Sequence, residues 1–296
     1  MTTLSIEVKA NKDQMRARRN RFGRSALRHL FLVIAASAFA LPIYLALVIS
    51  THSAIDLLRG VPFAPGTKLI SNLSSLFRGL PGTPRLGKMI FNSAIMALAI
   101  TILKLGLSIP AAYAISFFRF RSRDLLFGLI FVTLMMPIEV RFFPTYAVTA
   151  KLGMLNSQFG LILPLVASAT AVFVLRQFFM AFPIELADAA RIDGIGPIRF
   201  LIKIVLPLSR PVLAALAVLE FVYGWNQYLW PLVISSSANS STIVMGIKGL
   251  ISAAESFAIP QWNLVMALAI VALIPPVIVV IAMQKWFIKG LTTGIS

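Results

Sequence analysis

Polar side chains that interrupt long apolar stretches are the residues of this sequence best suited to chemistry. Glu220 is the clearest case, because Tyr223 and Gln227 follow it at i+3 and i+7 and form one polar stripe on a helix. A charge at the centre of a membrane helix costs about 2.5 to 3.5 kcal/mol on insertion scales, so the stripe should face protein or water. It could line the path of a solute or join helices through hydrogen bonds. Asn226 lies off the stripe and is a further candidate.

Two cations, Lys104 and Arg141, lie within or beside other apolar stretches and could bind an anionic solute. In the alternative interpretation, Lys104 pairs with a carboxylate such as that of Glu220, and Arg141 lies at the headgroup level beside Glu139. These residues complete the candidates for a substrate path. The sequence contains no cysteine, no HExxH motif and no Ser-His-Asp set, so we predict no catalytic residue, no metal site and no cofactor bound by this chain.

The composition places these side chains in a membrane protein. The 296 residues are 58% hydrophobic and only 12% charged, and the mean hydropathy is +0.88. Soluble domains carry about a quarter charged residues. The apolar runs are continuous rather than alternating, which favours transmembrane helices over a barrel. We therefore predict an all-α polytopic membrane protein.

The positive charge is unevenly distributed along the chain. The formal net charge is +17, and most Lys and Arg residues fall in segments that the apolar runs place on one side of the membrane. This bias is typical of cytoplasmic loops, and anionic lipid headgroups are the expected partners. Nucleic acid is excluded as a partner by the same distribution, because the charges lie between the spans rather than on one domain.

The apolar runs predict six transmembrane helices with both termini in the cytoplasm. The expected helices cover residues 30–49, 89–118, 125–143, 159–180, 212–235 and 264–283. Pro110 is expected to interrupt the second of them, and residues 144–157 and 236–262 are expected to be outside loops.

These helices divide the chain into five segments. The predicted segments are a basic cytoplasmic tail over 1–28, a first helix over 29–50, an external loop over 51–87, a core of five helices over 88–286 with a cytoplasmic loop at 181–211, and a cytoplasmic tail over 287–296.

The polar stretch from Pro183 to Pro207 separates two of these apolar runs and predicts a short helix over 184–192. Pro183 suits the first turn, and Glu185 lies where the helix dipole favours negative charge. Asp193-Gly194 supplies a stop. The segment therefore has the features of a docking element, although an ordinary surface helix would share many of them.

One narrow face of this helix is apolar and small. Leu186, Ala189 and Ala190 fall at i, i+3 and i+4, so another protein surface could approach closely there. Asp188-Ala189-Ala190 is followed by Asp193-Gly194. After nine intervening residues comes Ile204-Val205-Leu206-Pro207. This spacing resembles the EAA loop of ABC-importer permeases, with Asp188 in place of the usual Glu.

The resemblance extends from about Gly87 to Trp286 and indicates the type I ABC-importer permease fold, in the maltose-type carbohydrate class. Within that class it is greatest to permeases for sn-glycerol 3-phosphate. The motifs that carry it are Leu134-Met-Met-Pro-Ile-Glu-Val-Arg141-Phe-Phe-Pro-Thr145, Ala167-Ser-Ala-Thr-Ala171, Arg176-Gln-Phe-Phe-Met180, Tyr223-Gly-Trp-Asn-Gln-Tyr-Leu-Trp-Pro231 and Ala272-Leu-Ile-Pro-Pro276.

The resemblance implies a location in a bacterial cytoplasmic (inner) membrane and a role in ATP-driven import rather than enzymatic activity. Its implied partners are a second permease in a heterodimer, two ATPase subunits that hold ATP and Mg, and an external solute-binding protein. The implied ATPase-coupling residues are Glu185, Asp188, Ala189, Ala190, Asp193 and Gly194. The implied solute is sn-glycerol 3-phosphate or a glycerophosphodiester. The alternatives are a permease for a neutral sugar or oligosaccharide, a membrane-embedded enzyme, and a scaffold or channel that acts alone.

Overall fold

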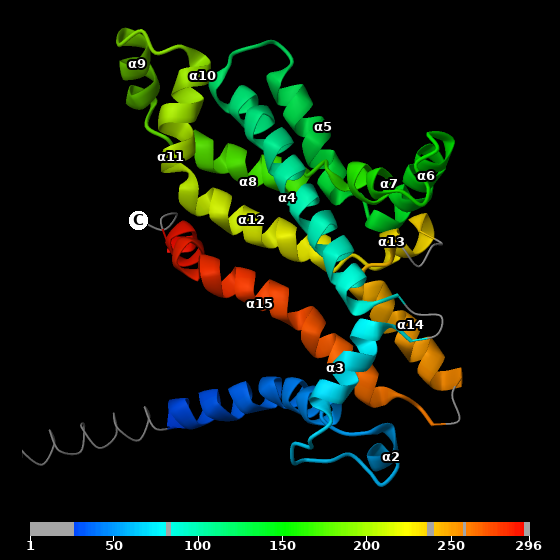
Figure 1. Ribbon diagram of the computed structural model, residues 1–296. Helices are drawn as coiled ribbons and strands as arrows, with labels where there is room; N and C mark the ends of the chain where they lie inside the picture. The colour runs from blue at the N-terminus through cyan, green and yellow to red at the C-terminus, as the bar shows by residue number, and fades with distance from the viewer. Residues whose placement is uncertain (1–26, 81–83, 236–239, 257–258, 293–296) are drawn as a thin grey trace, which may run out of the picture.

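The computed structural model is a bundle of helices, shown in Figure 1, and it describes residues 27–80, 84–235, 240–256 and 259–292. No strand occurs among these residues. The first helix is Leu27–Ser50. It is followed by α2 (Ala54–Leu57), α3 (Leu69–Arg78), α4 (Leu86–Phe117), α5 (Arg123–Met135), α6 (Ile138–Lys151), α7 (Gln158–Ile162), the 3-10 turn η1 (Leu163–Leu165), α8 (Ala169–Met180), α9 (Ile184–Ile192), α10 (Pro197–Phe200), a π-helical turn (Leu201–Val205), α11 (Leu206–Leu208), α12 (Arg210–Trp225), α13 (Leu229–Ile234), α14 (Ile243–Ser256) and α15 (Trp262–Thr292).

Three helices in the described ranges are long and apolar enough to cross a membrane unaided: Leu27–Ser50, α4 and the larger part of α15. Three further pairs of helices pass the same test together, each bent by more than 40° at its break, which allows up to six spans. In Figure 1, α9, the start of the first helix and the end of α15 lie toward the left, while α6, α13 and α14 lie toward the right. The arrangement is compatible with a chain that crosses from one side of the membrane to the other with each span. The cytoplasmic placement of the termini stays a prediction.

Helix α4 lies at the centre of the bundle and packs against α8, α12 and α14. Its approach to α12 depends on small residues. A Cβ atom at Gly224 would lie 2.9 Å from the Cα atom of Ala97, so only glycine allows the two backbones this close, as is common between membrane helices. Trp225 continues the contact, because its Nε1 donates to the carbonyl oxygen of Ala272 on α15 at 3.0 Å.

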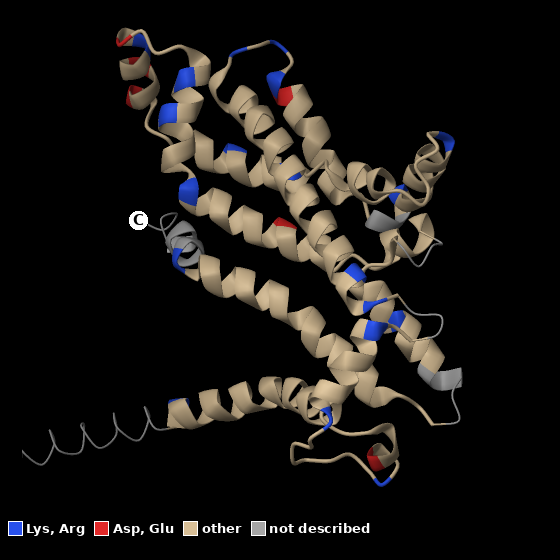
Figure 2. Ribbon diagram, in the orientation of Figure 1, with Lys and Arg blue, Asp and Glu red and all other residues tan. Residues whose placement is uncertain are grey.

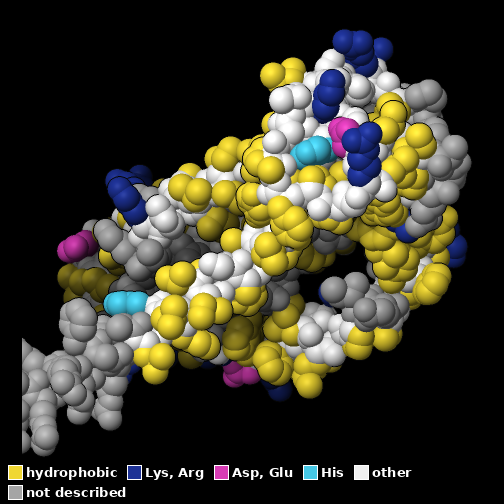
Figure 3. All heavy atoms as spheres, turned by 90° about the horizontal axis from the view of Figure 1, so that it is seen from below, with side chains coloured by type: hydrophobic (Ala, Val, Ile, Leu, Met, Phe, Trp, Pro, Cys, Tyr) yellow, Lys and Arg dark blue, Asp and Glu magenta, His cyan; other side chains and the backbone are white. Residues whose placement is uncertain are grey.

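Much of the apolar surface is exposed. Phe39 on the first helix is 82% exposed, and α5 has no buried residue. Figure 3 shows hydrophobic side chains over most of one face, with Lys and Arg mainly toward its two ends. Exposure of this extent is typical of helices that face lipid or another transmembrane subunit.

The predicted third helix was wrong in its second half. Helix α5 ends at Met135, and Pro137 caps a separate helix, α6, which continues to Lys151 through residues predicted as a loop. Met136 takes an extended conformation (φ −75°, ψ 121°), because a residue before proline is sterically driven out of the helical region. At Pro110 the prediction failed in the opposite direction, since α4 stays helical through it.

Other helix boundaries also differ from the prediction. The fourth span is interrupted at residues 166–168, between η1 and α8, and the fifth ends at Trp225 before the separate helix α13. Helix α14 lies in the expected outside loop 236–262 and packs on α15 and α4, while α2 and α3 lie in the segment 51–87. These helices are too short or too polar to cross a membrane. A prediction based on long apolar runs therefore assigned them to loops.

A buried amide fixes the segment after the first helix. Asn72 on α3 donates through Nδ2 to the carbonyl oxygens of Ser50 (2.8 Å) and His52 (2.9 Å). Asn263 on α15 donates to Asn72 Oδ1 at 2.9 Å. One amide therefore joins three parts of the chain, and Ser53 stabilises α2 nearby through hydrogen bonds that lower the pKa of the Asp56 carboxyl.

Candidate functional site

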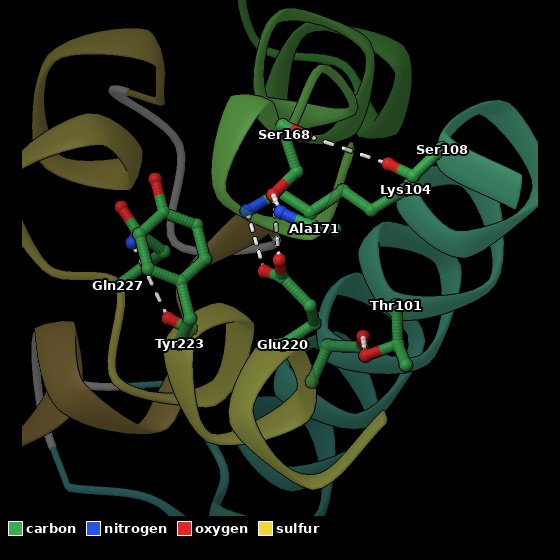
Figure 4. A network of polar contacts seen from close by, with 9 residues as sticks. Thr101, Lys104, Ser108, Ser168, Ala171, Glu220, Tyr223 and Gln227 are labelled. Carbon is green, nitrogen blue, oxygen red and sulfur yellow. Dashed lines mark hydrogen bonds and ion pairs between the residues drawn. The ribbon is translucent and has the colours of Figure 1, made fainter. Parts of the chain in front are cut away.

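A buried ion pair lies in the middle of the bundle (Figure 4). Lys104 Nζ on α4 is 2.7 Å from Glu220 Oε2 on α12, and the two residues are only 6% and 7% exposed. The second carboxylate oxygen, Oε1, accepts a hydrogen bond of 2.7 Å from Ser168 Oγ. The alternative interpretation of Lys104 as the partner of Glu220 is therefore confirmed. Both charges are compensated in place, as burial in an apolar bundle requires.

Ser168 connects this pair to the break between η1 and α8. It is the N-cap of α8, and its Oγ accepts a hydrogen bond from the Ala171 amide at 3.1 Å. Its own carbonyl accepts a long hydrogen bond of 3.5 Å from Ser108 Oγ on α4. The beginning of α8 is thus held by α4 and α12 together. Sequence reasoning missed Ser168, although a serine directly before an apolar helical run is an N-cap signal.

The predicted polar stripe lies only partly on one helix, because α12 ends at Trp225, after Glu220 and Tyr223 and before Gln227. Lys104 Nζ lies 3.7 Å from the centroid of the Tyr223 ring, which is a cation–π contact. Gln227 Nε2 donates to the Tyr223 carbonyl oxygen at 3.2 Å. Asn226 is exposed and lies off this line. Lys104 therefore covers one face of the Tyr223 ring, and Glu220 holds Lys104 in this position.

A hollow of about 170 Å³ lies at the outer end of the stripe. Its polar lining comes from Arg141 and Thr145 on α6 and from Tyr223 and Gln227, and its aromatic lining includes Phe142 and Trp230. Lys104 and Glu220 do not line it. Trp230 is fixed by a hydrogen bond of 3.1 Å from its Nε1 to the Gly160 carbonyl oxygen. Among the described residues, the lining contains a guanidinium and no carboxylate, so the hollow favours an anion that also presents apolar surface.

The predicted partners of Arg141 are only partly described. The side chain of Glu139 lies outside the described residues, so its expected place beside Arg141 stays a prediction. Arg141 is exposed and makes no ion pair with any described side chain. The structure brings Arg141 together with Tyr223 on α12 and with Gln227 in the break after it, which sequence spacing did not predict.

The helix predicted in the polar stretch 183–207 is confirmed with the same bounds, as α9 (Ile184–Ile192). The stop is also as expected. Asp193 is the C-cap, and Gly194 has a φ of +69°, a left-handed conformation that glycine adopts without strain. Ile195 closes the turn by donating its amide to the Ala190 carbonyl oxygen at 2.8 Å.

The expected apolar face of α9 was wrong at one of its three residues, because Ala190 points into the molecule while Leu186 and Ala189 are exposed. Ala190 is 4% exposed and packs with Ala187 in a cluster that includes Phe117 and Phe200. Tyr113 fixes this region by donating its hydroxyl to the Pro197 carbonyl oxygen at 2.9 Å. The spacing of apolar residues along a helix identifies its apolar face but not the part of the protein that covers this face.

The outward side of α9 carries the remaining predicted residues. Glu185, Leu186, Asp188 and Ala189 are exposed, and Asp188 Oδ1 accepts from Arg191 at 3.0 Å. Ile192, at the end of the helix, is 86% exposed. This side therefore combines apolar side chains with an exposed ion pair and has no cover within the described chain.

The sequence from 104 to 293 matches the family described as binding-protein-dependent transport system inner membrane component. This stretch covers the ion pair, the hollow and α9. The chain belongs to this family. It is accordingly an inner-membrane transport permease of an ABC importer and not an enzyme.

Two similar relatives extend the match over nearly the whole permease. The sn-glycerol-3-phosphate transport system permease protein UgpE of Pectobacterium atrosepticum is 48% identical over 275 residues, covering 92% of this chain and 97% of the relative. The protein of the same name from Yersinia enterocolitica is 50% identical over 276 residues, with the same coverage of both chains.

A solved structure supports the fold. A chain in the crystal structure of a bacterial ABC transporter involved in the import of the acidic polysaccharide alginate matches with a TM-score of 0.75 and 23% identity, covering 89% of this permease and 96% of that chain. The type I permease fold is therefore confirmed. Among the described residues, no group of three or more His, Cys, Asp or Glu is placed to hold a metal ion.

Proposed function

We propose that this permease forms half of the translocation path of an ATP-driven importer for sn-glycerol 3-phosphate or glycerophosphodiesters. The observation that carries the proposal is the identity of about half of all residues, over 92% of the chain, to permeases named for sn-glycerol 3-phosphate transport. The hollow beside Arg141 supports it, because a phosphate monoester or diester is an anion that a guanidinium binds with charge-assisted hydrogen bonds.

The proposed complex contains this chain, a second permease in a heterodimer, two ATPase subunits and an external solute-binding protein. ATP and Mg are held by the ATPase subunits. Both termini of this chain and the loop 181–211 lie in the cytoplasm in this proposal. The division into a tail over 1–28, a helix over 29–50, an external segment over 51–87, a core over 88–286 and a tail over 287–296 is retained.

In this proposal α9 couples the ATPase to the transmembrane helices. Glu185, Asp188 and Ala189 lie on its outward side, where another protein can contact them, while Asp193 and Gly194 hold its end. Ala190 acts from the inward side by anchoring α9 to the cluster of Phe117 and Phe200. Because α9 is anchored, a push on its outward side moves the attached helices as a body.

The candidate residues of the substrate path divide into two roles. Arg141, Tyr223 and Gln227 contact the solute in the hollow. Asn226, which is exposed, and Glu139 lie on the same external side of the membrane. Lys104 and Glu220 are positioning residues, since they contact the Tyr223 ring and α8 but do not line the hollow.

A neutral sugar is the competing solute, because the aromatic side chains of Phe142, Tyr223 and Trp230 could pack against a sugar ring. An uptake assay distinguishes glycerol 3-phosphate from a neutral sugar as the transported solute. In cells that express this permease with its neighbouring transport genes, we expect ATP-dependent uptake of labelled glycerol 3-phosphate and little uptake of a labelled disaccharide. Uptake of the disaccharide alone would contradict the proposed solute and leave the family assignment intact.

Replacement of Arg141 by glutamine tests the solute site directly. A hydrogen bond to a charged group contributes about 1.5 to 3 kcal/mol, so R141Q should lower glycerol 3-phosphate uptake by about tenfold or more. Lys151→Gln is the matched control, because it removes a positive charge from the exposed end of the same helix. Equal uptake by R141Q and K151Q, at equal amounts of permease in the membrane, would exclude Arg141 from the site.

A further inference from the structure

A second group of basic side chains lies far along the bundle from the hollow, where α4 ends and α5 begins. Arg119, Arg121 and Arg123 fall within five residues there, and with Phe120 and Asp124 they line a shallow hollow of about 400 Å³. Figure 2 shows this turn as basic and places it at the same end of the molecule as α9. By the expected topology, this is the level of the cytoplasmic headgroups.

The positive charge in this group is not neutralised by the described chain. Asp124 is the only acidic residue among the described residues of the lining. Its Oδ1 lies 3.4 Å from Arg123 Nε, and the Asp124 side chain is 83% exposed. No ion pair to Arg119 or Arg121 occurs among the described side chains. The group therefore keeps an excess of positive charge and favours an anion.

Arg176 on α8 extends the group toward the apolar part of the bundle. Its guanidinium carbon lies 3.8 Å from the centroid of the Phe127 ring, and Phe127 lies one helical turn after Arg123 on α5. Its Nε atom is buried and has no hydrogen-bond partner among the described residues. Arg176 therefore has hydrogen-bonding capacity that the described residues do not use.

Apolar surface begins directly beside these cations. The Phe127 ring stacks on Phe173 at 6.2 Å with an interplanar angle of 14°. Along α5, Leu125 is 66% exposed and Leu129 is 56% exposed. A ligand that contacts both features must join an anionic head to an apolar chain.

We propose that this surface, formed by Arg119, Arg121, Arg123, Phe127 and Arg176, binds an anionic phospholipid of the cytoplasmic leaflet. The phosphate lies against the arginines, and an acyl chain lies along the exposed face of α5. A basic recess between transmembrane helices at the cytoplasmic interface is the setting in which anionic headgroups bind. A soluble anion would leave the adjoining α5 face uncovered, so it accounts for only part of the surface. The proposal does not depend on the transported solute.

The test measures lipid retained by the complete transporter. The complex of this permease with its partner subunits is purified in mild detergent, exchanged into bilayers of defined phosphatidylglycerol and phosphatidylcholine content, and released for native mass spectrometry. We expect the wild-type complex to retain phosphatidylglycerol in preference to phosphatidylcholine. Arg121→Gln should weaken this retention about fivefold, the effect of one basic residue near an anionic surface, and Arg176→Gln should weaken it at least as much.

Arg199→Gln is the matched control, because Arg199 is an exposed arginine on α10, near α9 at the same end of the molecule. It should leave phosphatidylglycerol retention unchanged. Because Arg121 is exposed, R121Q is not expected to affect folding. The proposal can therefore be tested with R121Q even if the complex with R176Q fails to assemble. Equal retention by wild type and R121Q, or an equal loss in R199Q, would overturn the proposal. If the complex shows the same lipid preference but binds phosphatidylglycerol only through the partner ATPase, R121Q is again without effect and the proposal fails.

Discussion

Replacement of Glu220 by leucine is expected to strongly reduce the amount of folded permease in the membrane. The substitution leaves the Lys104 ammonium buried without its carboxylate and removes the acceptor of the Ser168 hydroxyl. Removal of one partner of a buried ion pair typically destabilises a protein by about 3 to 5 kcal/mol. The measurement is the thermal stability of the purified complex, together with the amount of inserted protein.

The matched control is the double variant Lys104→Met/Glu220→Leu, which removes both charges and keeps similar side-chain volumes. Well-packed apolar residues often replace a buried ion pair with little loss of stability, so the double variant should recover most of the stability that E220L loses. Since neither residue lines the hollow, glycerol 3-phosphate uptake should recover with it. A stable double variant without uptake would show that the pair does more than hold Tyr223 and α8.

Replacement of Gly194 by valine is expected to uncouple the ATPase from transport while the permease stays inserted. The φ of +69° at Gly194 is open to glycine and strained for a β-branched residue. A left-handed conformation costs an ordinary residue about 1 to 2 kcal/mol, which changes the population of the correctly ended α9 by a factor of about 5 to 30. The measurement is solute-stimulated ATPase activity and uptake by the reconstituted complex.

Gly196→Ala provides the control for Gly194→Val. Gly196 lies two residues later, at the N-cap of α10, with a φ of −64° and open space for a methyl group. Its replacement should therefore leave uptake and ATPase activity near wild type. No added atom would clash at Gly194 either, so a loss specific to G194V reports the backbone conformation. Full coupled uptake in G194V would remove the argument that α9 must end at this turn.

Local signals made α9 predictable with its bounds. Pro183 at its start and Asp193-Gly194 at its end act through the backbone of the residues themselves, so no distant contact is needed. The same is true of the long spans, because about 20 consecutive apolar residues are sufficient to cross a membrane. The pairing of Lys104 with Glu220 was anticipated for a related reason, since a charge within an apolar run needs a partner.

The breaks within the spans were harder to predict. Pro110 and Pro137 carry the same local signal, yet only Pro137 separates two helices, because α4 is packed on several sides and α5 is not. Helix α14 was missed because its apolar side is buried by α15 and α4, which only the folded chain brings near. Membrane helices tolerate proline where their neighbours satisfy the freed backbone groups.

The sequence alone determined the class of this protein, its apolar spans, the helix α9 and the polar residues that need partners, because hydropathy, capping and buried charge act over a few neighbouring residues. The tertiary structure decided which residues meet. It turned Ala190 inward, placed Arg141 beside Tyr223 and Gln227, and brought Arg176 on α8 against Phe127 on α5. These contacts join segments far apart in the chain, and helix packing rather than local spacing sets the distances between them.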